Sequence, residues 1–251
     1  MISQALILSA GLSTRMRPLT SHKPKSIVPF LGKRMMDWTC TYLQYYGIKE
    51  VACNLYHGKD AFYQELTKKP FPLPVDTFEE STLRNTGGGI LGMKPFMRQE
   101  HIVVMNCDFL CDINLHEVIE SHIQKKSLAT MVMVPQHNPN KYSSIEFNEK
   151  GEIAKLGSYK KDIKGKTTEG LFCGIHILHR EIFELMPQEK SFGIIEDVYV
   201  PLLEKGKAIH AFSSNSAWYD LGEIQEFSKN EILLYDRPLS WMKKHNTKKG
   251  W

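Results

Sequence analysis

A loop and two basic side chains near the start of the chain have the residue types of a phosphate-binding site. The loop follows an apolar run at residues 5–8 and consists of Ala10, Gly11, Leu12, Ser13 and Thr14. Small residues after a buried strand let backbone N–H groups approach a phosphate chain closely. Arg15 and Lys25 add positive charge nearby. The pattern favours a polyphosphate ligand. On spacing alone, a glycine turn with two surface cations is an equal alternative.

Two aspartates follow separate apolar runs. Asp108 comes after the run at residues 101–106, and Asp220 comes after a second, shorter run. An ionised carboxylate in such a place is costly unless it is paired or binds a cation. Two carboxylates at strand ends can share one Mg²⁺, which prefers oxygen ligands and keeps phosphate oxygens in its shell. Taken alone, Asp108 fits a helix or turn cap equally well, and the nearby Asp112 is interpreted as the cap of a helix that begins near Leu115.

The elements that must position these residues alternate between strand and helix in the first half of the chain. Apolar runs predict strands at residues 5–8, 51–54, 75–78, 101–106 and 129–134. Helical spacing predicts helices at residues 35–46, 59–66 and 115–125. Repeated strand–helix units indicate a mainly parallel sheet with helices on both faces.

The pattern changes after Pro135. Residues 144–147 and 153–156 flank a turn and predict a hairpin, and residues 160–168 are polar enough to form an exposed loop. A strand is expected at 171–178, where the internal Gly174 indicates a bulge or a close approach by a ligand. Further strands are predicted at 208–212 and 218–220, and further helices at 196–204 and 223–234. The fold class is therefore α/β, Rossmann-like, with a mixed, mostly parallel central sheet, and residues 1–251 are expected to form a single domain.

Composition excludes several classes of protein. A net charge of +4, with 42% hydrophobic and 24% charged residues, is ordinary for a globular enzyme and too weak for a nucleic-acid partner. No apolar stretch reaches the roughly 18 residues that span a bilayer, so no membrane partner is expected. Five cysteines, an odd number without metal-like spacing, indicate free thiols in a reducing compartment and a cytoplasmic location. The sequence leaves homo-oligomerisation open.

Four motifs together resemble the sugar nucleotidyltransferases. The segment at 10–20 with Lys23-Pro24-Lys25 is similar to G-x-G-T-R-x-x-P-L-T followed by P-K-P. Residues 83–90, Leu-Arg-Asn-Thr-Gly-Gly-Gly-Ile, resemble the L-x-E-T-G-G-G-I segment of N-acetylmuramate 1-phosphate uridylyltransferases and some mannose 1-phosphate guanylyltransferases. Residues 103–108 resemble the strand that ends in N-G-D, and residues 218–222 resemble W-x-D-x-G. The motifs occur in the family's order and cover most of the chain.

The resemblance implies the nucleotide-diphospho-sugar transferase fold and assigns roles to individual residues. The catalytic residues would be Arg15, Lys25 and Asp108. Besides the loop residues 10–14, Arg15 and Lys25, the nucleotide-binding residues would be Glu80, Asn85, Gly87 and Gly88. The sugar-binding residues would be Asn106, Ser143, Glu169 and Gly174. Asp108 and Asp220 would hold Mg²⁺. The nucleotide-binding half would cover about residues 1–110, and the sugar-binding half about residues 111–240.

The sequence departs from the family pattern at four positions. They are Ser13, Ser26, Asn85 and Cys107, which replace a glycine, a proline, a glutamate and a glycine. Asn85 lies beside the expected base and sugar pocket, so it weakens any inference about which nucleotide is used.

The implied activity is transfer of a nucleoside monophosphate from UTP or GTP to a sugar 1-phosphate, giving an NDP-sugar and pyrophosphate. Two alternatives stay open: a catalytically silent nucleotide- or sugar-sensing subunit of the same fold, and a cytidylyltransferase with a non-sugar phosphorylated acceptor. Regulatory subunits usually lose a loop cation or a metal aspartate, whereas Arg15, Lys25, Asp108 and Asp220 are all present.

Overall fold

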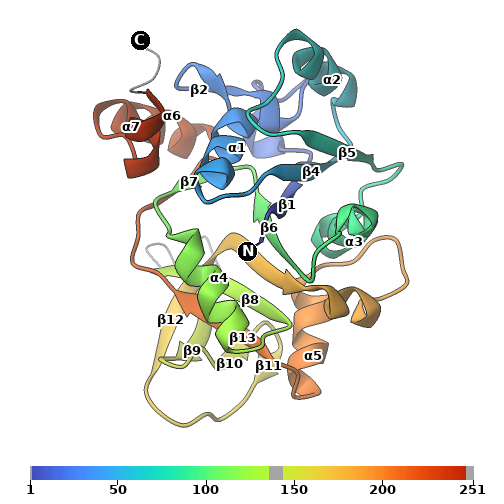
Figure 1. Ribbon diagram of the computed structural model, residues 1–251, viewed down its shortest axis with the longest axis vertical. Coiled ribbons are helices and arrows are strands. Elements are labelled where there is room, and N and C mark those ends of the chain that lie inside the picture. Colours follow the sequence, from blue (N-terminus) through green and yellow to red (C-terminus); the bar gives the residue numbers. More distant parts are fainter. Residues whose placement is uncertain (1, 136–143, 247–251) are drawn as a thin grey trace.

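A computed structural model describes residues 2–135 and 144–246, with side chains up to residue 243 (Figure 1). Its main sheet has ten strands, with the order β11-β10-β9-β12-β6-β1-β4-β5, while β8 pairs with β12 and with β13. The strands of the first half are β1 (Gln4–Leu8), β4 (Glu50–Leu55), β5 (Val75–Glu79) and β6 (His101–Asn106). Those of the second half are β8 (Ala129–Pro135), β9 (Ile145–Asn148), β10 (Ile153–Leu156), β11 (Tyr159–Lys160), β12 (Thr167–His179) and β13 (Ile209–Ser213).

The sheet is parallel throughout its first half and mixed beyond it. β6, β1, β4 and β5 pair in parallel, and so do β8 and β13. β12 is antiparallel to β6, β8 and β9, and it joins the two halves. The predicted fold class, a mixed sheet with helices on both faces, is confirmed.

Alternate residues of the central strands face two hydrophobic cores. In β6, Val103 and Met105 belong to one core, and Ile102 and Val104 belong to the other. The first core is covered by α1 (Met35–Tyr45), α2 (Lys59–Lys68), α4 (Leu115–Gln124), α6 (Ile224–Asp236) and α7 (Ser240–Asn246). The second is covered by α3 (Asn85–Gly92) and α5 (Val200–Glu204), the latter preceded by a π-helical turn, Ile195–Tyr199. Because both faces of β1 and β6 are buried, these strands have continuous apolar runs.

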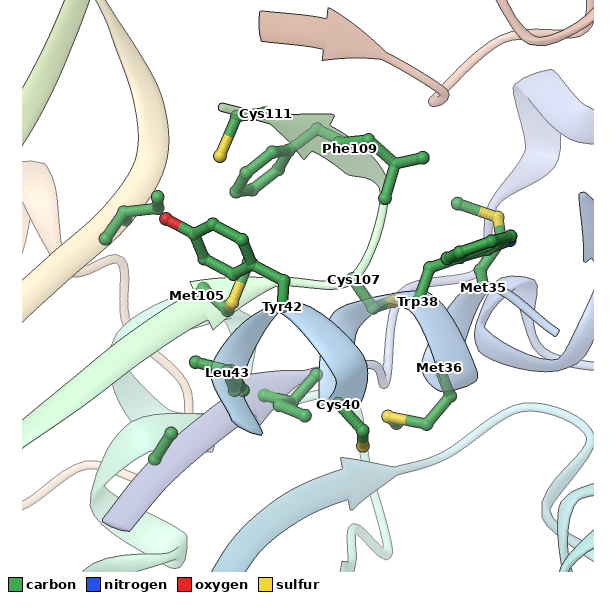
Figure 2. Packing of buried hydrophobic residues seen from close by; sticks show 14 of the residues in the cluster. Met35, Met36, Trp38, Cys40, Tyr42, Leu43, Met105, Cys107, Phe109 and Cys111 are labelled. Atoms are coloured by element: carbon green, nitrogen blue, oxygen red, sulfur yellow. The ribbon is translucent and has the colours of Figure 1, made fainter. Parts of the chain in front are cut away.

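Helix α1 lies at the centre of the first core (Figure 2). Its Trp38 packs edge-on against Trp241 of α7 at a ring distance of 6.1 Å and donates its indole N–H to the Phe30 carbonyl. The Tyr42 hydroxyl donates to the carbonyl of Ile113 at 2.8 Å. Both buried polar groups are therefore satisfied, as a buried aromatic residue requires.

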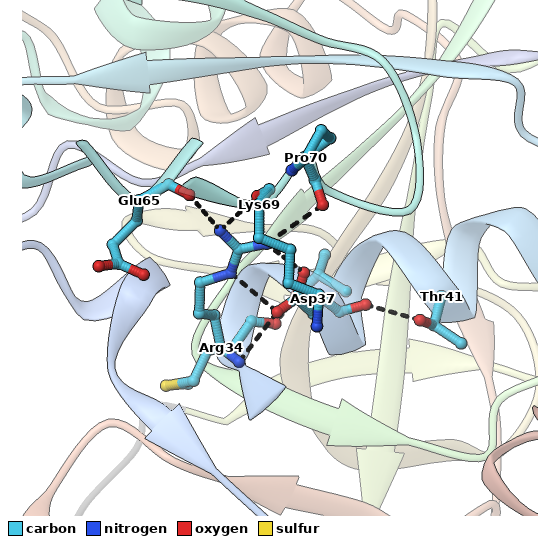
Figure 3. Close-up of polar contacts among 8 residues, drawn as sticks. Arg34, Asp37, Thr41, Glu65, Lys69 and Pro70 are labelled. Atoms are coloured by element: carbon cyan, nitrogen blue, oxygen red, sulfur yellow. Dashed lines mark hydrogen bonds and ion pairs between the residues drawn. The ribbon is translucent and has the colours of Figure 1, made fainter. Parts of the chain in front are cut away.

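A buried ion pair fixes the start of α1 (Figure 3). Arg34 Nη2 lies 2.7 Å from Asp37 Oδ1, and both side chains are at most 8% exposed. The same guanidinium donates to the carbonyls of Glu65 and Lys69 at the end of α2. The pair therefore joins two helices, and loss of either partner would leave a buried charge without a counter-charge.

Several short elements were not predicted. They are β2 (Pro29–Phe30), β3 (Lys33–Arg34), β7 (Phe109–Cys111), helices α3 and α7, and 3₁₀ turns at Thr14–Met16, Lys25–Ile27, Lys94–Phe96 and Arg180–Leu185. β7 pairs with the predicted short strand β14 (Trp218–Asp220) in a sheet of two strands. The predicted 160–168 loop is shorter than expected because β11 extends to Lys160 and β12 begins at Thr167.

The structure corrects the interpretation of Asp112. Asn114, rather than Asp112, is the N-cap of α4, where its side chain accepts a hydrogen bond from the His116 N–H. Asp112 instead accepts from the hydroxyl of Ser240 at 2.6 Å, at the start of α7. It therefore joins two segments that lie far apart in the sequence. In the part of the chain that the structure describes, no helix is long and apolar enough to cross a bilayer.

Candidate active site

A cavity of about 420 Å³ opens at the carboxyl ends of β1, β4 and β6. It is lined on the β1 side by Ser9, Ala10, Gly11 and Ser13, and across from them by Lys25, Asn54, Glu80, Asn85, Asn106 and Asp108. Ligands of open α/β sheets bind at this edge, where strands end and loops diverge. The structure thus brings most of the sequence-predicted nucleotide residues to one cavity.

Hydrogen bonds of Ser9 fix the loop after β1, and the space in front of Gly11 contains no protein atoms. The Ser9 N–H donates to Asn54 Oδ1 at 2.8 Å, and the Ser9 hydroxyl bonds to that of Ser26. An added Cβ at Gly11 would meet no protein atom within 4 Å, so the space in front of it is open to a ligand. Ser26, one of the departures from the family pattern, therefore helps to fix the loop.

Ser13 explains why the family pattern has glycine at this position. Its φ of +49° lies in the left-handed region, which a glycine adopts without a Cβ penalty. The Thr20 hydroxyl donates to the Ser13 carbonyl at 2.8 Å and supports this conformation. Of the other loop residues, Leu12 and Thr14 do not line the cavity, and Leu12 is exposed. Their contact with a nucleotide stays a prediction.

Lys25 and Asp108 form an ion pair at the floor of the cavity. Lys25 Nζ lies 2.7 Å from Asp108 Oδ2, and the lysine side chain is only 9% exposed. Asp220 approaches from β14, whose residue 220 pairs in register with Phe109. The Leu221 N–H donates to the carbonyl of Asp108, which fixes the two segments together. The predicted lysine and both predicted aspartates therefore meet at one place.

Gly222 keeps the space between the two carboxylates open. An added Cβ there would lie 2.9 Å from Asp220 Oδ1 and 3.6 Å from Asp108 Oδ2. The two carboxylates therefore border the same space, and Asp108 also lines the cavity. Oxygen donors from separate strand ends suit a hard divalent cation that also takes phosphate oxygens.

Arg15 lies at the exposed rim rather than in the cavity. Its guanidinium pairs with the Glu223 carboxylate, with the Arg15 side chain 63% exposed. Glu223 directly follows Gly222, so this contact joins the β1 loop to the Asp220 turn. Sequence reasoning missed Glu223, since nothing in the chain adjacent to Arg15 indicates a partner 208 residues away.

Glu80 lines the cavity and is also part of a buried hydrogen-bond network. One of its oxygens accepts from Asn54 Nδ2 at 2.7 Å, and the other accepts from the Arg84 N–H at 2.9 Å. An added Cβ at Gly89 would lie 2.5 Å from Asn54 Nδ2, so α3 packs directly on this network. Because both Glu80 oxygens have protein partners, its proposed contact with a base stays a prediction. Asn54 was missed; the available signal was an amide at the end of an apolar strand.

Gly87 and Gly88 face the protein rather than the cavity. Their N–H groups both donate to the Phe192 carbonyl, and an added Cβ at Gly87 would lie 2.4 Å from the Phe192 ring. The glycines therefore let α3 pack against residues 190–193, and they do not line the cavity. Asn85, at the start of α3, does line it and bonds to the Ser191 hydroxyl at 3.1 Å. Nucleotide contact by the two glycines stays a prediction.

Two of the predicted sugar-binding residues are neighbours. Gly174 has a φ of +91° within the irregular register of β12 between Phe172 and His176, as its position in a strand predicted. An added Cβ there would lie 2.9 Å from Asn106 Nδ2, so only glycine lets Asn106 keep its place. Glu169 is exposed on β12 and does not line the cavity. Ser143 lies outside the described residues.

Cys107 lines the same cavity but is unsuited to nucleophilic chemistry. Burial raises the pKa of its thiol to about 12, and the charge of Asp108 acts in the same direction. A thiol with this pKa is protonated at neutral pH, and the thiolate is the nucleophilic form. Cys107 is therefore a small buried residue at the position where the family pattern has glycine.

Comparison with known proteins identifies the family. The family model described as nucleotidyl transferase matches residues 4–234. The chain belongs to the nucleotidyl transferase family. The match includes the β1 loop, Lys25, Asp108 and Asp220, so the candidate site lies inside the matched segment.

Relatives of this chain include three sugar-phosphate enzymes. It is 25% identical to D-glycero-alpha-D-manno-heptose 1-phosphate guanylyltransferase of Aneurinibacillus thermoaerophilus, over 92% of this chain and 98% of that protein. It is 23% identical to mannose-1-phosphate guanylyltransferase of Mycobacterium tuberculosis and to UTP–glucose-1-phosphate uridylyltransferase of Synechocystis. Those two matches cover 92% and 89% of this chain but only 64% and 61% of the relatives, respectively.

Solved structures support the fold of the nucleotidyl transferase. The crystal structure of HddC from Yersinia pseudotuberculosis superposes with a TM-score of 0.76 at 24% identity, over 93% of this chain and 100% of that one. A putative glucose-1-phosphate thymidylyltransferase from Bacillus anthracis gives the same TM-score at 16% identity, over 94% and 96%. The arrangement of elements is thus shared with both solved structures despite low identity.

Proposed function

We propose that this chain transfers a nucleoside monophosphate from a nucleoside triphosphate to a sugar 1-phosphate and releases pyrophosphate. The observation that carries the proposal is that residues of the β1 loop, Lys25 and Asp108 line one cavity at the strand ends, while Asp220 borders the space next to Asp108. Backbone N–H groups, a buried ammonium and two carboxylates are the groups that phosphoryl-type transfer needs.

The proposed reaction requires alignment more than proton transfer. An oxygen of the sugar phosphate attacks the α-phosphorus, and the bond from that phosphorus to the bridging oxygen of the leaving pyrophosphate breaks. The attacking phosphate is already ionised at neutral pH, so no general base is needed. Catalysis then rests on holding the two phosphates in line and neutralising their charge.

The two basic residues have different proposed roles because they differ in burial. Lys25, buried against Asp108, acts as a fixed positive charge beside the α-phosphate. Arg15, exposed at the rim, neutralises the charge that develops on the departing pyrophosphate. A nucleotide at the rim would compete with Glu223 for the Arg15 guanidinium, since phosphate and carboxylate oxygens accept the same donors.

Asp108 and Asp220 fit the proposed Mg²⁺. Their carboxylates border the space beside Gly222, and oxygen-only donors are what this ion selects. When bound there, Mg²⁺ would neutralise phosphate charge as a Lewis acid. Asp108 also positions Lys25, so this carboxylate would serve both the cation and the lysine.

We assign the sugar side to the second half of the chain. The proposed boundary separates a nucleotide half, about residues 1–110, from a sugar half, about residues 111–240. Asn106 at the end of β6 and Gly174 on β12 meet at this boundary, which supports a sugar phosphate next to the α-phosphate. Glu169 reaches the sugar in this proposal only if the acceptor extends beyond the cavity.

The comparisons favour GTP as the donor to test first. The relative that matches over nearly its full length is a heptose 1-phosphate guanylyltransferase, and the solved structures include HddC with GMP-PN. UTP stays the second donor to test, since a uridylyltransferase is also among the relatives. We propose heptose 1-phosphate and mannose 1-phosphate as the first acceptors. The five cysteines, all free and buried, support the proposed cytoplasmic location.

The proposal is tested by incubating the purified protein with Mg²⁺, each nucleoside triphosphate and a panel of sugar 1-phosphates, and measuring pyrophosphate. We expect one preferred pair, with turnover lost in both Asp108→Asn and Lys25→Met. The matched controls are Asp112→Asn, whose side chain bonds to Ser240, and Lys94→Met, whose side chain pairs with Glu184 on the surface.

Release of no pyrophosphate from any pair, with nucleotide binding intact by calorimetry, would contradict the enzymatic proposal and favour the sensing subunit. Turnover only with a non-sugar phosphate would show that the acceptor is not a sugar 1-phosphate, while the proposed nucleotidyl transfer would still hold. Equal loss of activity in the two control variants would show that the assay reports folding rather than the site.

A further inference from the structure

Three metal-ligating side chains converge at the opposite end of β6 from the candidate active site. Glu100 directly precedes β6, whose first residue is His101, and His179 at the end of β12 pairs with His101 in the antiparallel register. His101 Nε2 lies 3.7 Å from one Glu100 oxygen, and His179 Nε2 lies 3.2 Å from the other. The three ligand atoms fall within 4.8 Å of one another. Among the described residues, no other group of three such side chains does so.

A buried relay can hold His101 with its ring proton on Nδ1. His101 Nδ1 lies 3.1 Å from Nε2 of His122, whose Nδ1 lies 2.8 Å from the Thr130 hydroxyl. If His101 donates from Nδ1, His122 accepts at Nε2 and donates from Nδ1 to Thr130, so every partner is satisfied. This arrangement leaves the Nε2 lone pair of His101 directed at the cluster. Metal-binding histidines characteristically have their other ring nitrogen fixed by such a hydrogen bond.

His179 has a second acid on its outer side. Its Nδ1 accepts from the Glu181 N–H at 3.3 Å and lies 3.8 Å from the Glu181 carboxylate. Ligation through Nε2 would move the ring proton to Nδ1, which would end the hydrogen bond from the Glu181 N–H and leave the Glu181 carboxylate, 3.8 Å away, as the nearby acceptor. A carboxylate behind a ligating imidazole is a frequent second partner in zinc sites.

We propose that Glu100, His101 and His179 form a zinc site. Two imidazole nitrogens and one carboxylate oxygen suit Zn²⁺ better than Mg²⁺, which takes oxygen ligands. His179 Nε2 and His101 Nε2 lie 3.2 and 3.7 Å from different oxygens of Glu100, and one ligand atom of each residue lies within 4.8 Å of the others. Small rotations of these side chains would bring them to a zinc ion with bonds of about 2.0–2.1 Å. The fourth position faces outward, where Glu100 is 68% exposed, and is taken by water.

The zinc ion would join β6 to β12, the contact between the two halves of the sheet. The active-site end of β6 is five residues farther along the strand, roughly 17 Å away. The ion is therefore expected to stabilise the fold and to leave the chemistry at Asp108 unchanged. The inference does not depend on the proposed transferase activity.

The test is calorimetric titration of Zn²⁺ into tag-free protein stripped of metal by a chelator and then desalted. We expect one equivalent to bind and the melting temperature to rise by roughly 5 °C at saturation. Glu100→Gln, an exposed change that should fold normally, is expected to weaken binding by about tenfold or more. The double variant His101→Gln/His179→Gln is expected to abolish binding.

Two further variants separate this site from other sources of zinc binding. The double variant Asp108→Asn/Asp220→Asn should still bind one equivalent of zinc, and the exposed His116→Gln should bind zinc like the wild type. Cobalt(II) in place of zinc should give the visible band of a four-coordinate site in the wild type and in Asp108→Asn/Asp220→Asn. The proposal is overturned if the wild type binds no zinc at an equimolar or higher zinc concentration, or if Glu100→Gln binds zinc as tightly as the wild type. It is also overturned if only Asp108→Asn/Asp220→Asn loses zinc binding.

Discussion

The two ends of β6 carry opposite kinds of polar chemistry on one buried strand. At the carboxyl end, Asn106 and Asp108 line a cavity beside the β1 loop, and the Asp108 carboxylate forms an ion pair with the Lys25 ammonium group there. At the amino end, histidines pack among themselves, and burial lowers the pKa of His101 and brings that of His122 to about 3.

The difference follows from the neighbours of the strand at each end. At the carboxyl end the parallel strands β1 and β4 stop together, so their loops diverge and leave space for a ligand. At the amino end the antiparallel β12 runs alongside β6 as far as the pair His101–His179, so side chains are held in contact. The same strand therefore presents charged groups to a cavity at one end and neutral ring nitrogens, which suit a borderline-soft cation, at the other.

The largest effect is expected at the carboxyl end. Lys25→Met should lower the rate of pyrophosphate release by about 10²–10³-fold, because a preorganised positive charge is lost next to the reacting phosphate. Asp108→Asn should lower it at least as much, since this carboxylate holds Lys25 and is the proposed metal ligand. Steady-state kinetics on the preferred substrate pair measure the effect. Retention of full activity in Lys25→Met would show that the reaction does not take place at this end of β6.

The next largest effect is expected on the free energy of unfolding at acid pH, through His122 near the amino end of β6. His122 is fully buried, and desolvation holds its pKa near 3 against 6.5 when unfolded, so protons bind the unfolded chain preferentially as the pH falls below 6.5. The free energy of unfolding should therefore drop by about 2 kcal/mol for this residue between pH 7 and pH 5. Urea unfolding at both pH values measures it, and the drop should shrink in His122→Gln. An equal drop in that variant would assign the acid sensitivity to other groups, of which the buried His176 is the first to test because its pKa is also lowered to about 3.

A pair of glycine substitutions separates packing from ligand space. Gly88→Ala puts a Cβ 2.3 Å from the Lys190 carbonyl and should cost about 1–3 kcal/mol of stability by overpacking. Gly11→Ala meets no protein atom and should keep the melting temperature while raising KM for the nucleotide. Thermal unfolding and kinetics on both variants test the contrast. A loss of stability in Gly11→Ala would show that the loop is packed rather than open.

The smallest effect is expected at the rim. Glu223→Gln removes the partner of a largely exposed Arg15 and should change the free energy of unfolding by less than about 1 kcal/mol. Raising the salt concentration should erase even this difference, because exposed ion pairs are screened. Denaturant unfolding of wild type and variant at low and high salt measures it. A larger, salt-independent cost would mean that the loop depends on Glu223 for its fold.

The sequence predicted most elements where a single local rule decides the outcome. The apolar run at His101–Asn106 matches β6 residue for residue, and α1 begins at Met35 as expected and ends before Gly47, whose φ is +87°. Such signals depend on residues close in the chain, so burial on both faces and a left-handed C-terminal glycine can be seen in advance.

Helix α3 shows why local rules failed elsewhere. Its residues Asn85–Gly92 include four glycines, each unfavourable in a helix by about 1 kcal/mol relative to alanine. The segment is nevertheless helical because Gly87 and Gly88 fit against Phe192, a contact across more than 100 residues. Tertiary packing here outweighs propensity, and a single sequence does not display it.

The chain by itself thus determined the parallel strands, the helices around them and the chemical types of the active-site residues, because these depend on apolar periodicity and on motifs within short segments. Only the tertiary structure decided which polar side chains meet: Lys25 with Asp108, Arg15 with Glu223, Asp112 with Ser240, and His101 with His179. The physical reason is that each of these pairs is set by strand register and loop closure over 78 or more residues, where the energy of the contact depends on the whole fold.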